Sequence, residues 1–325
     1  MDDLIEIDTH TGGLTRVTAG YLVPGPRPTL IECGPARSIE HTIAGLGAIG
    51  LAPDDLAHLV VSHVHLDHAG GAGDLARAFP TATVVVSELG ARHLVDPSRL
   101  NGSAQRVYGD LFDTVYGPCT PIDADRVLGV GDRHVLDLGG GRRLELLWTP
   151  GHAKHHLAVL DHDTGALFTG DSVGVKLPGM RVIRPATPPA DFQYETSLAT
   201  LARYRSLDPA RLYLAHYGPV DPPLEALEEA EDRLRAWVAA GEEAYRASSE
   251  VDHVASMLAQ RFRDELEDAG GADTEPDEDG APSANLDHRS EVRRRLELLN
   301  GVASNAAGIV RYLARRDAGT LTPIG

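Results

Sequence analysis

Over the first two thirds of the chain, apolar residues gather in short runs separated by Gly, Pro and Asp. Runs bounded in this way are typical of buried strands. Helical spacing of apolar residues occurs between some of them, at Ser38–Ile49 and Asp74–Phe79. We therefore predict alternating strands and helices. The predicted strands are Thr15–Val23, Thr29–Cys33, Leu59–Val61, Thr83–Val86, Arg143–Trp148, Leu157–Leu160, Ala166–Thr169 and Leu212–Ala215.

The pattern changes after residue 221, where Pro222 and Pro223 interrupt the chain. Apolar residues then recur at spacings of three and four, for example over Val251–Phe262 and Val292–Leu313, which predicts helices. Residues 267–283 are rich in Asp, Glu, Gly and Pro and show no apolar period, so we predict a mobile acidic loop there. The sequence thus divides into a strand-rich region, 1–221, and a helical region, 222–325.

Composition narrows the class of protein. The 325 residues include 30 Lys and Arg against 48 Asp and Glu, a net charge of −18, which argues against a nucleic acid as partner. Two cysteines cannot form a disulfide scaffold. No apolar run approaches the roughly 20 residues that span a membrane. The start, MDDLIEID, lacks the basic and apolar pattern of a secretory signal. We expect a cytoplasmic protein without a membrane partner.

The chemistry is concentrated in Ser62–Gly71. This segment places His63, His65, Asp67 and His68 directly after the predicted strand Leu59–Val61. Imidazole and carboxylate are the ordinary non-thiolate ligands of zinc. In a tight turn, the first two histidines can point one way while the aspartate and the third histidine point another. The segment therefore predicts a metal site with room for two ions.

Three more candidates follow other predicted strands. His152 follows Arg143–Trp148, Asp171 follows Ala166–Thr169, and His216 follows Leu212–Ala215. Loops at strand ends converge on one rim in layered α/β folds, so these side chains should meet the first cluster.

The order of these residues resembles a family signature. His-x-His-x-Asp-His, a His after Pro-Gly, an Asp after Thr-Gly and a final His are the pattern of metallo-β-lactamase-fold hydrolases, and all seven positions occur between His63 and His216. The resemblance extends over residues 15–220. Four further runs resemble a largely uncharacterised bacterial and archaeal subgroup with a helical C-terminal extension: His93–Ser98, Thr149–His156, Phe168–Val175 and Thr187–Pro189.

The resemblance implies a fold and a ligand set. The fold would be α+β, an αββα sandwich with the catalytic domain in residues 1–221 and a mostly helical C-terminal region. The cofactor would be two Zn²⁺ ions per chain, with Mn²⁺ or Fe²⁺ as alternatives. His63, His65 and His152 would hold one ion, Asp67, His68 and His216 the other, and Asp171 would bridge them.

The implied activity is hydrolysis of a small ester, lactone, thioester or phosphodiester by a metal-bridging hydroxide. Asp67 or Asp171 would relay the proton. Candidate substrate contacts lie in two weakly periodic segments, 101–118 and 175–189, which we interpret as loops over the site. They are Tyr108, Tyr116, Arg181 and Arg184. His156 is a candidate either for orienting a ligand or for packing.

Other functions remain open at this stage. A mononuclear iron enzyme like the persulfide dioxygenases would use His63, His152 and Asp171. A nuclease of the same fold is disfavoured by the charge and by the short segment between Asp171 and His216. A non-catalytic metal-binding partner protein is a further alternative. The expected partner is a small-molecule substrate, and the helical region offers a surface for a homodimer.

Overall fold

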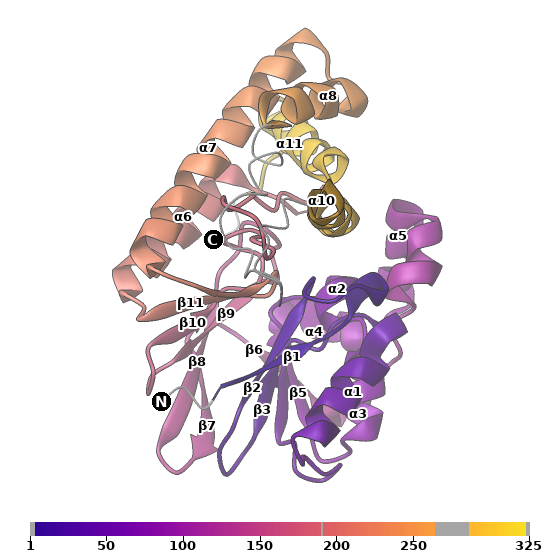
Figure 1. Cartoon of the computed structure of the whole chain (residues 1–325), viewed down its shortest axis with the longest axis vertical. Helices are drawn as coiled ribbons and strands as arrows, with labels where there is room; N and C mark the ends of the chain where they lie inside the picture. The colour runs from indigo at the N-terminus through magenta and orange to yellow at the C-terminus, as the bar shows by residue number, and fades with distance from the viewer. Residues whose placement is uncertain (1–3, 190, 264–285, 323–325) are drawn as a thin grey trace.

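The computed structural model describes residues 4–189, 191–263 and 286–322, with the backbone alone for 286–289. Two sheets pack face to face with helices on their outer faces (Figure 1). The first has the strand order β1-β2-β3-β4-β5-β6 and the second β12-β11-β10-β9-β8-β7. Strands β3 to β6 are parallel, as are β10 and β11, and the other neighbours are antiparallel. The predicted α+β sandwich is confirmed.

The bounds of the elements are as follows. The strands are β1 (Ile5–Asp8), β2 (Ala19–Val23), β3 (Thr29–Ile31), β4 (His58–Val60), β5 (Thr83–Ser87), β6 (Val127–Val130), β7 (His134–Gly139), β8 (Arg142–Trp148), β9 (Leu157–Asp161), β10 (Ala166–Phe168), β11 (Arg211–Leu214) and β12 (Gly218–Val220). The α-helices are α1 (Ile39–Ala48), α2 (Leu66–Ala69), α3 (Ala72–Ala78), α4 (Glu88–Val95), α5 (Ser98–Tyr108), α6 (Tyr194–Leu207), α7 (Pro223–Ala247), α8 (Val251–Arg261), α10 (Leu286–Asn300) and α11 (Val302–Asp317).

Burial on both faces explains why the strands appear as unbroken apolar runs. In β5, Val84 and Val86 pack in one hydrophobic cluster with Leu46 of α1 and Leu75 of α3. Val85, which points to the opposite face, packs between the two sheets. Side chains alternate across a strand, so a strand covered on both faces needs apolar residues at every position.

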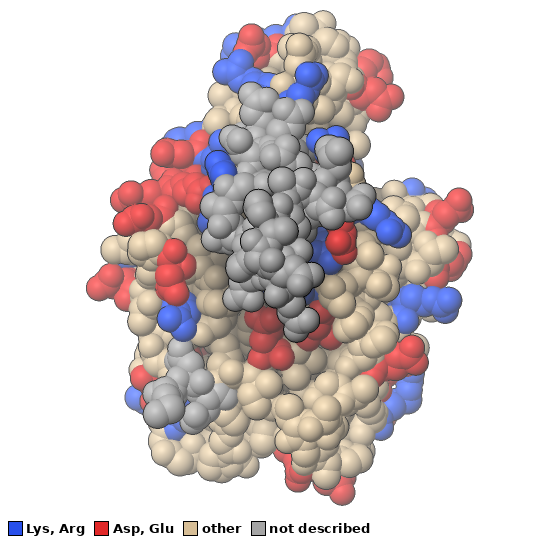
Figure 2. All heavy atoms as spheres, viewed as in Figure 1, with Lys and Arg blue, Asp and Glu red and all other residues tan. Residues whose placement is uncertain are grey.

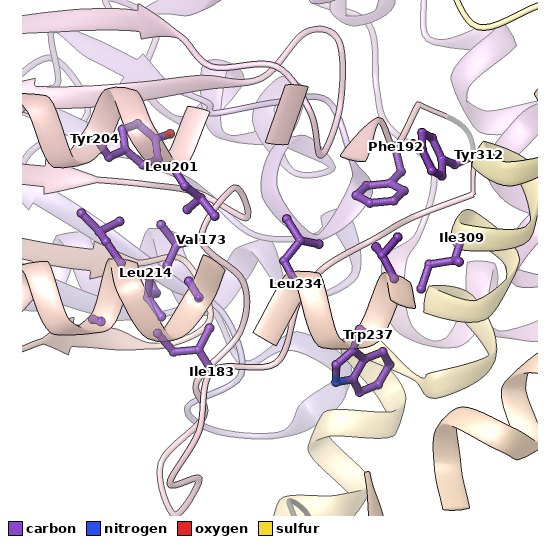
Figure 3. Packing of buried hydrophobic residues seen from close by; sticks show 14 of the residues in the cluster. Val173, Ile183, Phe192, Leu201, Tyr204, Leu214, Leu234, Trp237, Ile309 and Tyr312 are labelled. Atoms are coloured by element: carbon purple, nitrogen blue, oxygen red, sulfur yellow. The ribbon is translucent and has the colours of Figure 1, made fainter. Parts of the chain in front are cut away.

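The helical region shares a core with the outer face of the second sheet. Leu147 of β8 and Leu214 of β11 belong to the same buried cluster as Trp237 of α7 and Ile309 of α11. Figure 3 shows this packing from Leu214 through Leu234 to Ile309. The predicted C-terminal helices are therefore present, and one core crosses the predicted boundary at residue 221. The predicted acidic loop, 267–283, lies outside the described residues.

Two segments differ from their predicted structure. The strand predicted over Thr15–Val23 begins only at Ala19, and residues 15–18 form bends. Residues 101–118, interpreted as a loop, contain most of α5 and a π-helical turn, Phe112–Tyr116. The backbone N–H of Ser98 donates to the Asp96 carboxylate at 3.1 Å at the start of α5. In α5 only Ala104 is fully buried, but Leu100, Ala104 and Tyr108 recur at a spacing of four and pack in one cluster, so the helix has a short apolar stripe that the sequence analysis overlooked.

The surface is acidic on one flank. Figure 2 shows Asp and Glu side chains gathered over α7, whose sequence begins PLEALEEAED. Among the described residues, no helix has both the length and the apolar character needed to cross a bilayer.

Candidate metal centre

The structure brings all seven predicted side chains together at one rim of the two sheets. They come from the connections that follow β4, β8, β10 and β11, and all are buried except His65, which is half-buried. The seven are His63 and His65 after β4, Asp67 and His68 in α2, His152 after β8, Asp171 after β10 and His216 after β11.

His63, His65 and His152 form a first group of imidazoles. His65 Nδ1 lies 2.8 Å from His63 Nε2 and 3.2 Å from His152 Nε2. His152 Nδ1 lies 3.0 Å from the backbone oxygen of Ala186, and an N–H donated there leaves the Nε2 lone pair directed at the group. Three imidazole nitrogens thus converge on one point.

Asp67, His68 and His216 form a second group. The Nε2 atoms of His68 and His216 are 3.1 Å apart. Asp67 Oδ2 lies 3.4 Å from His216 Nε2 and 3.6 Å from His68 Nε2. His216 Nδ1 lies 2.9 Å from the backbone oxygen of Val17, so its Nε2 also faces the group.

Asp171 lies between the two groups. Its Oδ1 is 3.3 Å from His68 Nε2 and 3.2 Å from His216 Nε2. Its Oδ2 is 3.4 Å from His152 Nε2, in the first group. The ligand atoms of His63, His68 and Asp171 also lie within 4.8 Å of one another. One carboxylate therefore contacts both groups of histidines.

The two groups differ in their preferred protonation. Burial lowers the pKa of His152 to about 4 and that of His63 well below its usual value, so both are neutral near pH 7. Burial alone would also lower the pKa of His216, but Asp171 and Asp67 raise it to about 9. Burial would raise the pKa of Asp67, but His68 and His216 lower it to about 2. The two carboxylates thus attract positive charge to the centre.

These residues fit a divalent cation. Neutral imidazoles and ionised carboxylates are ligands for zinc, manganese and iron. The closest pairs of imidazole nitrogens, His63 with His65 and His68 with His216, are 2.8 and 3.1 Å apart, and each pair can share only one proton. Hydrogen bonds within the protein therefore cannot satisfy all of these nitrogens. Asp171 Oδ1 is buried and makes no hydrogen bond of acceptable geometry, although the Nε2 atoms of His68 and His216 lie 3.3 and 3.2 Å away. A buried acceptor of this kind is costly unless a cation or a donor faces it.

Two residues outside the predicted ligand set support it. Glu32, at the end of β3, is buried with Oε1 3.3 Å from His68 Nδ1, and its Oε2 accepts the backbone N–H of Ser62. His156 Nε2 accepts the backbone N–H of Asp171 at 3.2 Å. Sequence analysis named His156 as a candidate but missed Glu32, whose signal is a single acid directly after the apolar run TLI.

A cavity of about 420 Å³ opens above the centre. Asp67, His152, Asp171 and His216 contribute to its lining. The remaining lining comes from His65 and Val175, from α5 and the turn after it, from residues 186–189, and from α10 and α11 with the glycine between them. The C-terminal helices therefore form part of the wall of the candidate site.

Of the predicted substrate contacts, Tyr108 and Tyr116 line this cavity, whereas Arg181 and Arg184 are not among the described residues that do. Arg184 is buried elsewhere. One of its terminal nitrogens (Nη1) lies 3.4 Å from a Glu297 carboxylate oxygen and donates to the backbone oxygen of Asn300, while the guanidinium lies 5.5 Å from the Trp237 ring. This arginine therefore ties α10 to the 184–188 segment rather than facing the cavity.

Known proteins with similar sequences share this fold. A metallo-beta-lactamase fold-containing protein of Sulfurisphaera tokodaii is 37% identical over 208 residues, which are 63% of this chain and 74% of that protein. In the crystal structure of that archaeal protein, the match covers 72% of this chain and 86% of that one, with a TM-score of 0.62 and 32% identity. A protein of Thermosynechococcus vestitus named "Putative diflavin flavoprotein A 1" is 28% identical over 213 residues, but the match covers 33% of its length.

The helical region is also part of a known arrangement. The crystal structure of a metallo-beta-lactamase family protein from Thermus thermophilus matches 97% of this chain and 93% of that chain, with a TM-score of 0.61 and 21% identity. This likeness shows the fold, including the C-terminal helices. The family model for the metallo-beta-lactamase superfamily matches residues 12–216, which span the candidate centre. The chain belongs to the metallo-beta-lactamase superfamily.

Proposed function

We propose that the protein is a metal-dependent hydrolase with a dinuclear centre. The observation that carries the proposal is the position of Asp171, whose two carboxylate oxygens face different groups of histidines at the base of a cavity. A single carboxylate between two sets of ligands is the arrangement that two neighbouring cations require.

The seven residues would form two sets of metal ligands. His63, His65 and His152 would hold one cation, and Asp67, His68 and His216 would hold the second, with Asp171 shared. When bound, such cations act as Lewis acids toward a carbonyl or phosphoryl oxygen and lower the pKa of water. We favour Zn²⁺, with Mn²⁺ or Fe²⁺ as alternatives, because the donors are nitrogen and oxygen.

The carboxylates also provide for proton transfer. Asp67 and Asp171 both line the cavity floor, so either can accept the proton that water loses as it attacks the substrate. Glu32 holds the His68 ring and Ala186 holds the His152 ring, so neither imidazole has to reorient during a cycle. The reaction class is hydrolysis of an ester, lactone, thioester or phosphodiester.

A nuclease activity receives less support. The α7 flank is acidic, and no Lys or Arg is among the described residues that line the cavity. Such a field repels a polyanionic strand and slows its association. An iron enzyme that consumes oxygen uses the same kinds of ligand, so metal identity and oxygen uptake separate it from the hydrolase.

The test compares the hydrolysis rates of protein stripped of metal by a chelator and of protein reconstituted with metal. The substrates are neutral carboxylic esters, lactones and thioesters, together with phosphodiesters. We expect hydrolysis of at least one class, loss of turnover after chelation, and recovery with Zn²⁺ or Mn²⁺. Asp171→Asn should abolish turnover, whereas His253→Ala in α8, a histidine outside the cavity lining, should retain it. Hydrolysis that survives chelation, or that Asp171→Asn leaves unchanged, would contradict the proposal.

A further inference from the structure

Two apolar walls line the cavity beside the metal centre. They come from helices that are far apart in the sequence and lie next to each other in Figure 1. Leu298 of α10 packs against the buried cluster that contains Ala104 of α5, so both helices border the same apolar cluster. The α5 wall consists of Val107 and Tyr108 of α5 and Leu111 just after it. The C-terminal wall consists of Leu298, Leu299 and Ala303.

The α5 wall exposes large apolar side chains. Val107 is 62% exposed and Leu111 is 41% exposed, at the end of a helix whose other exposed residues are polar. Exposed apolar residues that cluster at a cavity mark a ligand surface more often than single scattered ones do. Since neither side chain supports the core, their apolar character is not required for folding.

The charge of the lining restricts the ligand further. Among the described residues that line the cavity there is no Lys or Arg, and the one charged side chain outside the metal centre is Glu297. A phosphate or carboxylate on the part of the substrate beside these walls would find no Lys or Arg among the described lining residues to pair with, and the one carboxylate of these walls, Glu297, is already paired with Arg184. An uncharged, apolar group would instead lose contact with water at no electrostatic cost.

Building on the hydrolase function proposed above, we infer that the substrate is an uncharged carboxylic ester or lactone whose apolar acyl chain lies between the α5 wall and the C-terminal wall. The carbonyl carbon would lie at the metal centre. Water adds to that carbon, the bond to the leaving oxygen breaks, and this oxygen takes up a proton. An ester gives a carboxylic acid and an alcohol, and a lactone gives a single hydroxycarboxylic acid. A cavity of about 420 Å³ is at the small end of ligand sites, which suits a medium-length chain.

The first test measures kcat/KM for p-nitrophenyl acetate, butyrate, hexanoate and octanoate with the metal-loaded full chain. Each buried methylene should raise kcat/KM about three- to fourfold until the cavity is filled. An ester of the same length that ends in a carboxylate should be at least tenfold worse than its neutral counterpart. A flat series, or a preference for the carboxylate-ended ester, would overturn the inference while leaving the hydrolase function intact.

Matched variants locate the effect. Val107→Ser should reduce kcat/KM for octanoate more than for acetate. Because Val107 is highly exposed, the substitution should not affect folding. Val135→Ser, at an exposed valine of β7 that is 49% exposed and does not line the cavity, should leave the series unchanged. Equal effects of the two substitutions on the octanoate-to-acetate ratio would overturn the assignment of the α5 wall.

A binding measurement separates this inference from the proposed function. The fluorescence of N-phenyl-1-naphthylamine, a neutral apolar probe, is followed with the metal-free full chain, and 1-octanol or 1-butanol competes with it. Octanol should displace the probe at lower concentration than butanol. Val107→Ser should weaken the binding of both the probe and octanol. If no ester is hydrolysed but this binding is found, the apolar site stands and the hydrolase function fails. Absence of binding overturns the apolar site.

Discussion

Gly308 of α11 allows the C-terminal helices to lie close to the segment beside the candidate metal centre. A Cβ added at this position would lie 1.9 Å from the backbone oxygen of Thr187 and 2.8 Å from that of Pro188. Both are backbone atoms and cannot rotate away. The same segment carries Ala186, whose oxygen lies 3.0 Å from His152 Nδ1. Close contact of α11 with residues 186–188 therefore links the helical region to a candidate ligand.

The expected loss of stability in Gly308→Ala follows from these contacts. To restore an ordinary contact of 3.4 Å, Gly308→Ala must push α11 and Thr187 apart from 1.9 Å. The hydrogen bonds of Thr187 to Asn305, at 2.7, 2.9 and 3.1 Å, would then break. At about 1 kcal/mol each, their loss outweighs the gain of about 1 kcal/mol that alanine brings to a helix. We expect a net loss of about 2 kcal/mol in the free energy of unfolding, within the usual cost of overpacking.

Urea unfolding measures this loss, and competition with a chromophoric chelator measures metal affinity. Gly308→Ala should also weaken metal binding about tenfold or more, because displacing a partner of a ligating histidine has effects of that size. Gly47→Ala is the matched control, since Gly47 lies in α1 with open space around its added Cβ. If Gly308→Ala is as stable as Gly47→Ala and binds metal like the unmodified chain, the helical region does not brace the centre.

Three further substitutions test other contacts. His152→Ala should lower the metal content of the purified protein and remove most turnover, and full occupancy with normal turnover would exclude it as a ligand. Glu32→Gln removes the negative charge beside His68 and should weaken metal binding about 10- to 100-fold in the chelator competition; unchanged affinity would show that this carboxylate only packs. Arg184→Met leaves the buried backbone oxygen of Asn300 without its donor and should lower the free energy of unfolding in urea by about 1–3 kcal/mol. Arg106→Met, at the surface, is the control and should leave that free energy almost unchanged. Equal stabilities of the two variants would rule out the role of Arg184 in holding α10.

The sequence predicted the fold where both faces of an element are buried. Strand β5, TVVVS, is recognisable because each position must be apolar. Helix α6 is not, since its buried face consists of Ser197, Thr200, Leu201 and Tyr204, which have no clear apolar period. Strand β7 alternates buried and exposed residues and could have been found from its period of two.

The candidate site, like the fold, could be predicted from the sequence only in part. The seven clustered side chains follow strands, so their meeting could be predicted from sequence. The position of Arg184 could not, because its partners Glu297 and Asn300 are more than a hundred residues away. The pairing of the apolar walls could not be predicted for the same reason, since Leu298 of α10 meets the cluster of α5 only in the folded chain.

The most direct test of a dinuclear hydrolase is the number and identity of metal ions per chain, measured by elemental analysis on the same sample whose ester hydrolysis is assayed. Two divalent ions per chain, with hydrolysis that appears in step with the second, is the predicted result. One iron per chain with oxygen uptake and no ester hydrolysis would contradict the account.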